Sequence, residues 1–322
     1  MAYRKLLDGM RGLRAVVVGD VMLDEYIVGT VDRVSPEAPV MVVKKRSSRW
    51  VPGGAANVAK NISALGGFAI VLGVVGDDSA GELLAGKFET DQGVNCNLVV
   101  DKSRVTTRKT RVVANHSHQV LRIDEEETSP ISPVLEDRVL ESWLKWLDTA
   151  DVLVLSDYRK GLLTPKVCSV LIGAARQKGI PALANAKPGS VGCFAGAQLV
   201  SLNRGEAGEV VGRRPTSRNE ASAMGRDLAT ATQSDAVLVT MGEEGLVSWS
   251  ASGVFEIPAP QVEAYDVAGA GDTVLATVSL GLAKKGYDRE VFELAAEVGA
   301  KVVQHIGVAV PSSKDLDAIR SL

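Results

Sequence analysis

The segment at residues 264–272 combines small residues with one acidic side chain directly before a predicted helix. It reads Ala-Tyr-Asp-Val-Ala-Gly-Ala-Gly-Asp, and a helix-like run at 273–285 follows it. Small residues let the backbone approach a ligand closely, and the amides and dipole at a helix amino terminus favour an anion there. We expect the carboxylate in this anion site, Asp272, to accept a proton from a hydroxyl that attacks a bound phosphate. The alternative interpretation is that Asp272 only caps the helix.

Two further patterns carry groups suited to hydroxyl and phosphate chemistry. Residues 52–59 place two glycines and Asn57 at the start of a predicted helix, where the amide can donate to and accept from hydroxyls. Asn57 could instead bond its own helix backbone. Asn203 and Glu206 follow a predicted strand on one turn, and together they could hold the water shell of Mg²⁺. The chain contains no GxxxxGK[ST] sequence, which excludes a Walker-type phosphate loop.

The elements that must position these groups alternate between buried strands and helices. Helix-like segments at 55–65 and 165–178 lie between continuous apolar runs, which are typical of strands buried on both faces. This alternation predicts an α/β fold with a parallel sheet covered by helices. The predicted strands are 15–18, 70–75, 152–155, 181–184, 199–202 and 236–240.

Polar or small residues follow nearly every predicted strand. In an open parallel sheet, ligands bind beyond the carboxyl ends of the strands, so we expect these residues to line one crevice. They are Asp20, Asp24, Asp77, Asp78, Asp157, Lys187, Asn203 and the run Thr240-Met241-Gly242.

Two stretches lack any segment of helix length and have extended, partly alternating sequence. They are residues 26–51 and 104–124, and the second is expected to form a hairpin that turns at 115–117. Together they predict a small sheet that stands off the main domain as a lid, a dimer surface or both. The alternative is that they are edge strands of the main sheet.

Composition excludes several classes of protein. The 322 residues carry 36 Lys and Arg against 39 Asp and Glu, a net charge of −3, which is not the footprint of a nucleic-acid or anionic-membrane binder. The three cysteines have no CxxC spacing and predict neither a zinc site nor a disulfide framework. Because no segment approaches the ~20 apolar residues of a membrane span or has the pattern of a signal peptide, we expect a cytoplasmic protein with no membrane partner.

In their order along the chain, these patterns and the GDVMLD sequence at 19–24 resemble the ribokinase/PfkB family of sugar kinases. The resemblance covers essentially the whole chain. Within the family, the segments at 19–26, 33–40, 52–59, 107–113, 156–161 and 265–273 are most similar to kinases that phosphorylate O1 of D-glycero-D-manno-heptose 7-phosphate.

The resemblance implies a ribokinase-like, three-layer αβα fold with a mostly parallel central sheet and a small β-sheet lid. Residues 1–322 would form a single kinase domain, with the lid at about 26–51 and 104–124. ATP and Mg²⁺ would be the cofactors, and a sugar phosphate the substrate. The lid would close over the sugar to exclude water, and it would also join two copies in a homodimer.

The resemblance also implies roles for single residues. Asp272 would be the base. The amides that neutralise the transferred phosphoryl group would be those of Ala268, Gly269, Ala270 and Gly271. The residues that bind the sugar phosphate would be Asp20, Asp24, Gly53, Gly54, Asn57, Arg111, Asp157, Lys160 and Lys187. Those on the nucleotide side would be Thr240, Gly242 and Gly245, with Asn203 and Glu206 organising Mg²⁺ through water. The candidate cations for the sugar's own phosphate are Arg33, Arg108, Lys109, Arg111, Arg122, Lys160 and Lys187.

Several positions depart from the heptose-kinase pattern. Asn185 replaces an acidic residue, Glu297 and Lys301 stand in a helix expected to be rich in small residues, and Gly307-Val308 replaces Gly-Thr. Two other functions therefore stay open: a PfkB kinase for another sugar or sugar phosphate, and a nucleotide- or sugar-binding regulator with weak catalysis. A Rossmann dehydrogenase is excluded, because no GxGxxG follows the first strand. The chain has no HxGH motif of the nucleotidyltransferase that many relatives carry, so we expect the kinase alone.

Overall fold

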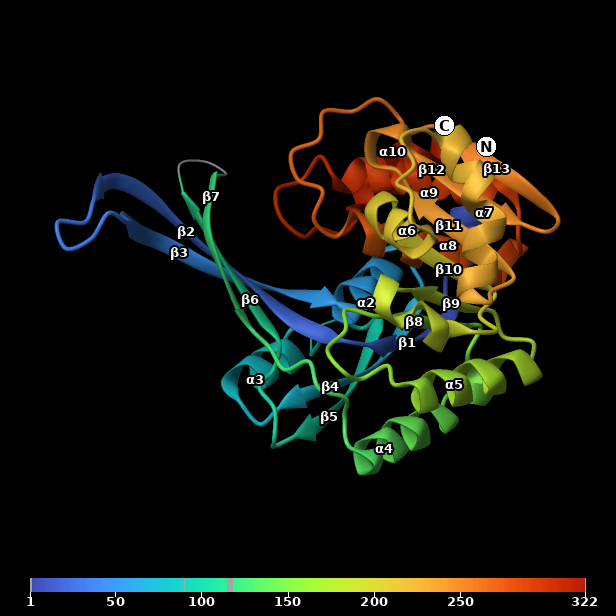
Figure 1. Ribbon diagram of the computed structural model, residues 1–322, viewed down its shortest axis with the longest axis horizontal. Coiled ribbons are helices and arrows are strands. Elements are labelled where there is room, and N and C mark those ends of the chain that lie inside the picture. Colours follow the sequence, from blue (N-terminus) through green and yellow to red (C-terminus); the bar gives the residue numbers. More distant parts are fainter. Residues whose placement is uncertain (1, 90, 115–117, 322) are drawn as a thin grey trace.

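The computed structural model describes residues 2–89, 91–114 and 118–321, which form two separate sheets (Figure 1). The larger sheet has nine strands in the described residues, and the seven from β11 to β5 are parallel. Two antiparallel strands extend one edge. In order across the sheet the strands are β13 (Gly253–Ile257), β12 (Leu246–Ser250), β11 (Ala236–Thr240), β10 (Leu199–Asn203), β9 (Ala182–Asn185), β8 (Val152–Ser156), β1 (Arg14–Gly19), β4 (Phe68–Gly76) and β5 (Val94–Asp101).

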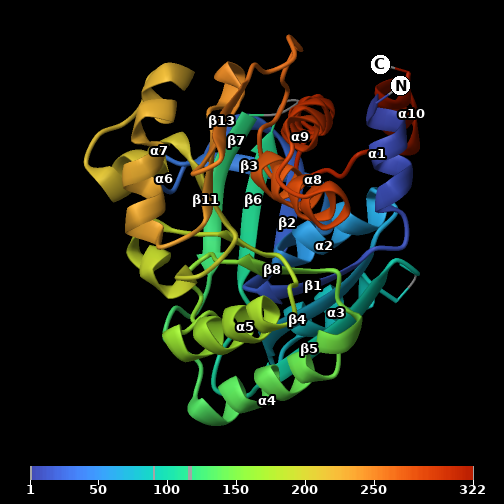
Figure 2. The ribbon, with the colours of Figure 1, turned by 90° about the vertical axis from the view of Figure 1, so that its right-hand side faces the viewer.

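Helices cover both faces of this sheet, as Figure 2 shows for α8 and α5 on opposite sides of β8 and β1. One face packs against α1 (Ala2–Met10), α2 (Ala55–Ala64), α3 (Ser79–Gly86), α8 (Ala270–Lys285), α9 (Arg289–Val302) and α10 (Ser313–Arg320). The other packs against α4 (Pro133–Leu144), α5 (Pro165–Gln177), α6 (Arg204–Val211) and α7 (Arg218–Thr232). The adjacent residues Val16 and Val17 of β1 are fully buried in opposite cores. This confirms the predicted three-layer αβα arrangement.

Short 3₁₀ turns complete the helical elements at η1 (Leu147–Thr149), η2 (Pro188–Phe194) and η3 (Gly242–Glu244). No helix in the described parts of the chain is both long enough and apolar enough to span a membrane.

The smaller sheet extends away from the main body on the left of Figure 1. Its order is β3 (Met41–Gly54), β2 (Val21–Val34), β6 (Arg108–Ala114) and β7 (His118–Glu125). We call these four strands the lid sheet. They pair with one another and not with the nine-stranded sheet, so the edge-strand alternative is wrong. The predicted hairpin is confirmed as the antiparallel pair β6 and β7, and its expected turn at 115–117 lies outside the described residues.

Asp24 follows β1 as expected, but it belongs to a strand of the other sheet. It lies inside β2, paired with Val51 of β3. The reason is that only Asp20 separates β1 from β2, and its amide bonds the Ser156 carbonyl at 3.0 Å, so the chain crosses directly from one sheet into the other. Asp78 also has another role, since its Oδ1 accepts the Gly81 amide at 2.9 Å and caps α3.

Candidate active site

Asp272 lies in the first turn of α8 and is only 4% exposed. Its Oδ2 accepts a hydrogen bond from Nδ2 of Asn57 at 2.8 Å, and its Oδ1 accepts one from the Tyr158 hydroxyl at 2.8 Å. The residue in the N-cap position of α8 is Gly269, and no side chain caps the helix there. The carboxylate is therefore held by two groups that are distant in sequence, and the capping alternative does not describe it.

Burial raises the pKa of Asp272 to about 6. The hydrogen bonds from Asn57 and Tyr158 and the charge of Lys187 oppose this shift by favouring the ionised form, while the charge of Asp24 adds to it. A carboxyl group that titrates near neutral pH can both take up and release a proton under physiological conditions. The site thus contains a group suited to general base chemistry.

The packing of α2 against α8 places Asn57 beside this carboxylate. Nδ2 of Asn61 donates to the Asn57 carbonyl at 2.9 Å, and Oδ1 of Asn61 accepts from the Thr273 hydroxyl at 2.8 Å. Gly269 has a φ of 83°, and a Cβ there would lie 2.9 Å from Nδ2 of Asn57. A glycine is therefore needed at this point both for its backbone conformation and for the close approach of the two helices.

The amino end of α8 is where the sequence predicts an anion site, and two of the four amides assigned to that site already have acceptors. The Ala268 amide donates to Oδ1 of Asp266 at 2.9 Å, and the Ala270 amide to the Val267 carbonyl at 3.3 Å. Amides in the first turn of a helix have no partner within the helix and point outward. Gly269 and Gly271 lie on this same turn, together with Asp272.

Three of the residues predicted to bind sugar come together at the end of the lid sheet that is nearest the main body. Asp24 on β2 forms an ion pair with Arg111 on β6, and both side chains are mostly buried. A Cβ on Gly53 would lie 2.2 Å from Oδ2 of Asp24, so glycine leaves room for that carboxylate. The charge of Asp24 acts on Asp272, which indicates that these three residues lie close to Asp272. Gly54, with φ of 59°, makes the turn from β3 into α2.

Asp20 and Asp157, also expected to contact sugar, hold the backbone of the loop that follows β8. The Asp20 carboxylate accepts the amides of Tyr158 at 2.8 Å and Lys160 at 2.9 Å. Oδ1 of Asp157 accepts the Arg159 amide at 2.7 Å, and its other oxygen accepts the Ser190 hydroxyl. Their physical role in this structure is to fix the position of Tyr158.

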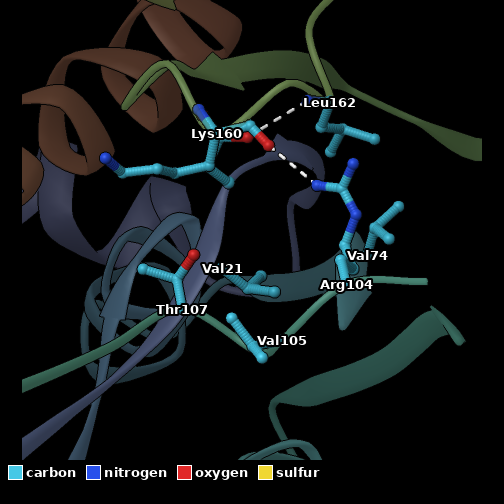
Figure 3. A pocket seen from close by; sticks show the side chains of 8 residues that line it. Val21, Val74, Arg104, Val105, Thr107, Lys160 and Leu162 are labelled. Atoms are coloured by element: carbon cyan, nitrogen blue, oxygen red, sulfur yellow. Dashed lines mark hydrogen bonds between the residues drawn. The ribbon is translucent and has the colours of Figure 1, made fainter. Parts of the chain in front are cut away.

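The loop at 158–162 is also held by a side chain of the segment before β6, next to a pocket shown in Figure 3. Arg104 reaches across this pocket and donates to the Lys160 carbonyl at 2.9 Å. The residues that line the pocket are Asp20, Val21, Val74, Arg104, Val105, Thr107, Lys160 and Leu162. Asp272 is not among them, whereas Asp20 and Lys160 are, so this pocket lies beside the loop that carries Tyr158.

The predicted magnesium pair forms a capping box at the start of α6. Oδ1 of Asn203 accepts the Glu206 amide at 3.0 Å, and Oε2 of Glu206 accepts the Asn203 amide at 2.8 Å. Oε1 of Glu206 also lies 2.5 Å from Nζ of Lys187. Asn203 therefore caps α6, a structural role that its spacing to Glu206 alone did not indicate. Of the two residues, only Glu206 also forms an ion pair with another predicted site residue, Lys187.

The other residues assigned to the nucleotide side lie next to this capping box. Thr240 ends β11 and pairs in register with Asn203. Gly242 and Gly245, with φ of 64° and 97°, form the turn between β11 and β12. A Cβ on Gly245 would lie 2.1 Å from the Ile257 carbonyl oxygen, so this turn requires glycine.

Most cations of the predicted phosphate-binding pool form ion pairs with acidic residues of β7 and the segment after it. Lys109 lies 3.1 Å from Asp124 and 3.2 Å from Glu126, which also bonds Lys160 at 2.8 Å. Their charges are thus concentrated where the lid sheet meets the loop after β8. The remaining pairs are Arg108 with Glu125 and Arg122 with Asp124, while Arg33 lies near the far end of β2.

Two sets of contacts were not predicted from the sequence. One is the hydrogen bond from Tyr158 to Asp272, although the resemblance includes the segment at 156–161. The other joins the lid sheet to the segment before α10: the Val308 amide donates to the Tyr26 hydroxyl at 3.2 Å, and Arg49 donates to the Ile306 carbonyl at 3.1 Å. The Gly307 amide donates to Oδ2 of Asp266, two residues before Ala268. The Gly307-Val308 departure therefore lies where the lid sheet meets the segment before α8.

Comparison with known proteins agrees with this geometry. Residues 13–315 match the family described as pfkB family carbohydrate kinase. The chain is 40% identical over 99% of its length to the bifunctional protein HldE of Caulobacter vibrioides, and 37% identical over 98% to that of Bradyrhizobium diazoefficiens. It spans 66% and 64% of those two proteins, about two thirds of their length.

Solved structures show the same ribokinase-like fold. Phosphofructokinase-2 from Escherichia coli, in complex with potassium, has a TM-score of 0.80 at 20% identity, covering 97% of this chain and 98% of that one. Arabidopsis thaliana ribokinase, complexed with ribose and ATP, has a TM-score of 0.72 at 17% identity, covering 97% and 99%. The fold inferred from the resemblance is confirmed.

Proposed function

The chain belongs to the pfkB family of carbohydrate kinases, and we propose that it phosphorylates O1 of D-glycero-D-manno-heptose 7-phosphate, with Asp272 as the base. The buried Asp272 carboxylate at the amino end of α8, with a pKa of about 6, is the observation that supports this mechanism best. The heptose substrate is supported by the motif resemblance and by the similarity to proteins named HldE. This reaction would supply a sugar 1-phosphate for a nucleotidyl transfer.

In the proposed reaction, Asp272 takes the proton of the O1 hydroxyl as that oxygen forms a bond to the terminal phosphorus of ATP. The bond between that phosphorus and the bridging oxygen breaks, and ADP leaves with the electron pair. The amides at the start of α8 stabilise the charge on the transferred group. Asn57 and Tyr158 hold the base in a fixed orientation, because each donates to a different carboxylate oxygen.

The donor set near Lys187 fits a magnesium ion that is held mainly by water and phosphate. Glu206 offers one carboxylate, and within the described ranges no group of three His, Cys, Asp or Glu side chains could hold a metal. Mg²⁺ keeps several waters when it binds nucleotide phosphates, so a single nearby carboxylate is sufficient. When bound there, the ion would neutralise part of the phosphate charge. Lys187, paired with Glu206, would act on the same phosphates.

The cations of β6 and of the loop after β8 are the proposed site for the substrate's own phosphate. Lys109 and Lys160 share Glu126, and Arg111 pairs with Asp24 next to the base. A phosphate dianion would exchange these ion pairs for charge-assisted hydrogen bonds. This arrangement favours an acceptor that carries phosphate over a neutral sugar.

We also propose a homodimer formed through the lid sheet, whose strands expose the apolar side chains of Val28, Leu121 and Ile123. Solution scattering should give a dimeric mass at micromolar concentration. A monomeric mass throughout the micromolar range would contradict this part of the proposal.

Phosphorus NMR of a reaction with ATP, Mg²⁺ and heptose 7-phosphate tests substrate and position together. We expect a new anomeric phosphate resonance and an equal amount of ADP. A parallel panel of neutral sugars and other sugar phosphates, with coupled ADP detection, serves as the control. Turnover of a neutral sugar without turnover of the heptose phosphate would disprove the proposed substrate while leaving the kinase assignment in place.

A further inference from the structure

Tyr158 connects the base to the nucleotide side of the site. Its hydroxyl donates to Oδ1 of Asp272 at 2.8 Å, and Nζ of Lys187 lies 5.0 Å from the centroid of its ring. Lys187 is in turn paired with Glu206 at 2.5 Å. The tyrosine therefore lies between the proposed base and the proposed phosphate-binding lysine.

The position of this ring is fixed by its backbone. The Tyr158 amide donates to Asp20, and the next residue, Arg159, has a φ of 56°, a conformation that non-glycine residues seldom adopt. Arg104 holds the Lys160 carbonyl from behind, as Figure 3 shows. Such a strained and well-anchored loop orders the hydroxyl before any ligand binds.

We infer, on the premise of the proposed function, that Tyr158 is a positioning residue whose hydroxyl orients the Asp272 carboxylate and keeps it ready to accept a proton at neutral pH. Oδ2 is held by Asn57 and Oδ1 by Tyr158, so the carboxylate cannot rotate without losing one of the two bonds. Each oxygen keeps a second lone pair, which leaves an acceptor position for the sugar hydroxyl.

The electrostatics around the pair agree with this role. Burial, followed by the Asp272 charge, raises the pKa of Tyr158 well above its usual value, so the tyrosine stays a donor at neutral pH. The charged groups that act on the pair are Lys187 after β9, Asp24 on β2 and Glu206 on α6. The tyrosine hydroxyl favours the ionised form of Asp272, so its removal should raise the pKa of the base.

Tyr158→Phe removes the hydroxyl and keeps the ring over which Lys187 lies. The loss of a hydrogen bond to a charged group changes the pKa of that group by about one unit or more. The acidic limb of kcat/KM should therefore move upward by about one unit, with roughly a tenfold loss below pH 6 and a much smaller loss at pH 8.5. Tyr287→Phe is the matched control, because that hydroxyl bonds Ser248 at 2.9 Å in the main body.

A second substitution should shift the acidic limb of the pH profile in the opposite direction. Tyr158→3-fluorotyrosine makes the hydroxyl a stronger donor with little change in volume, so the acidic limb should move downward. This variant also covers the case in which Tyr158→Phe fails to fold. A purely structural role would change the amount of active enzyme and not the position of the pH limb.

Direct titration of Asp272 by carboxyl carbon NMR in the ligand-free protein separates this inference from the proposed function. The resonance is assigned by its absence in Asp272→Asn. We expect an upward shift of its midpoint in Tyr158→Phe, a downward shift in the fluorotyrosine variant and no shift in Tyr287→Phe. Equal midpoints in all variants would overturn the role of Tyr158, whether or not heptose 7-phosphate is a substrate.

Discussion

Replacing Gly269 by alanine tests whether the close contact between α8 and Asn57 matters for catalysis. A Cβ at this position would lie 2.9 Å from Nδ2 of Asn57, about 0.5 Å inside the 3.4 Å of ordinary contact. The backbone φ of 83° adds a cost of roughly 1–2 kcal/mol for an L-residue. The amide of Asn57 must move, and with it the 2.8 Å hydrogen bond to Asp272.

The expected loss of activity follows from that hydrogen bond. A hydrogen bond to a charged group contributes about 1.5–3 kcal/mol, and about 1.4 kcal/mol corresponds to tenfold in rate. Gly269→Ala should therefore lower kcat/KM by roughly 10- to 100-fold. The measurement is steady-state ADP release with the preferred sugar, together with urea unfolding of the same protein.

Gly212→Ala separates the effect of backbone strain from that of the contact. Gly212 ends α6 with a φ of 74°, and no atom of the described residues lies within 4 Å of an added Cβ. This variant should lose a similar free energy of unfolding and keep the wild-type kcat/KM. Wild-type activity in Gly269→Ala, or an equal loss of activity in Gly212→Ala, would refute the importance of the contact.

Two further predictions concern pH and the lid. Because Asp272 must be ionised to accept a proton and burial raises its pKa to about 6, kcat/KM should fall about tenfold per pH unit below pH 6; a flat profile down to pH 5 would contradict a base with this pKa. Tyr26→Phe removes the acceptor of the Val308 amide, so we expect a roughly 2- to 10-fold higher KM for the sugar and faster amide exchange in the segment around Val308. Unchanged KM and exchange would show that this contact does not hold the lid.

Continuous apolar patterning predicted most of the fold. The predicted helix at 165–178 corresponds to α5, and the strands at 15–18 and 236–240 to β1 and β11. The strands β5, β12 and β13 were not predicted. Their sequences mix polar and apolar residues, because β5 and β13 lie at the edges of the sheet and several of their side chains are partly exposed. A continuous apolar run is lost wherever one face of a strand is not buried.

The candidate site was predictable where local sequence determines it. The small-residue turn before α8 identified Asp272, and the two glycines before α2 identified Asn57. The hydrogen bond from Tyr158 to Asp272 joins residues 114 positions apart, so no local pattern could indicate it. The same reason applies to Asp20, whose carboxylate bonds a loop about 140 residues away. Long-range polar contacts depend on the packing of the whole chain.

Asp272→Asn is the most direct test of the central claim, because the amide keeps the size of the carboxyl group and cannot accept the proton. Single-turnover phosphoryl transfer with ATP, Mg²⁺ and the sugar phosphate should be slower by roughly 10²- to 10⁴-fold. Binding of ATP and of the sugar phosphate, measured separately by calorimetry, should stay close to wild type. Transfer at the wild-type rate in Asp272→Asn would contradict the assignment of this residue as the base.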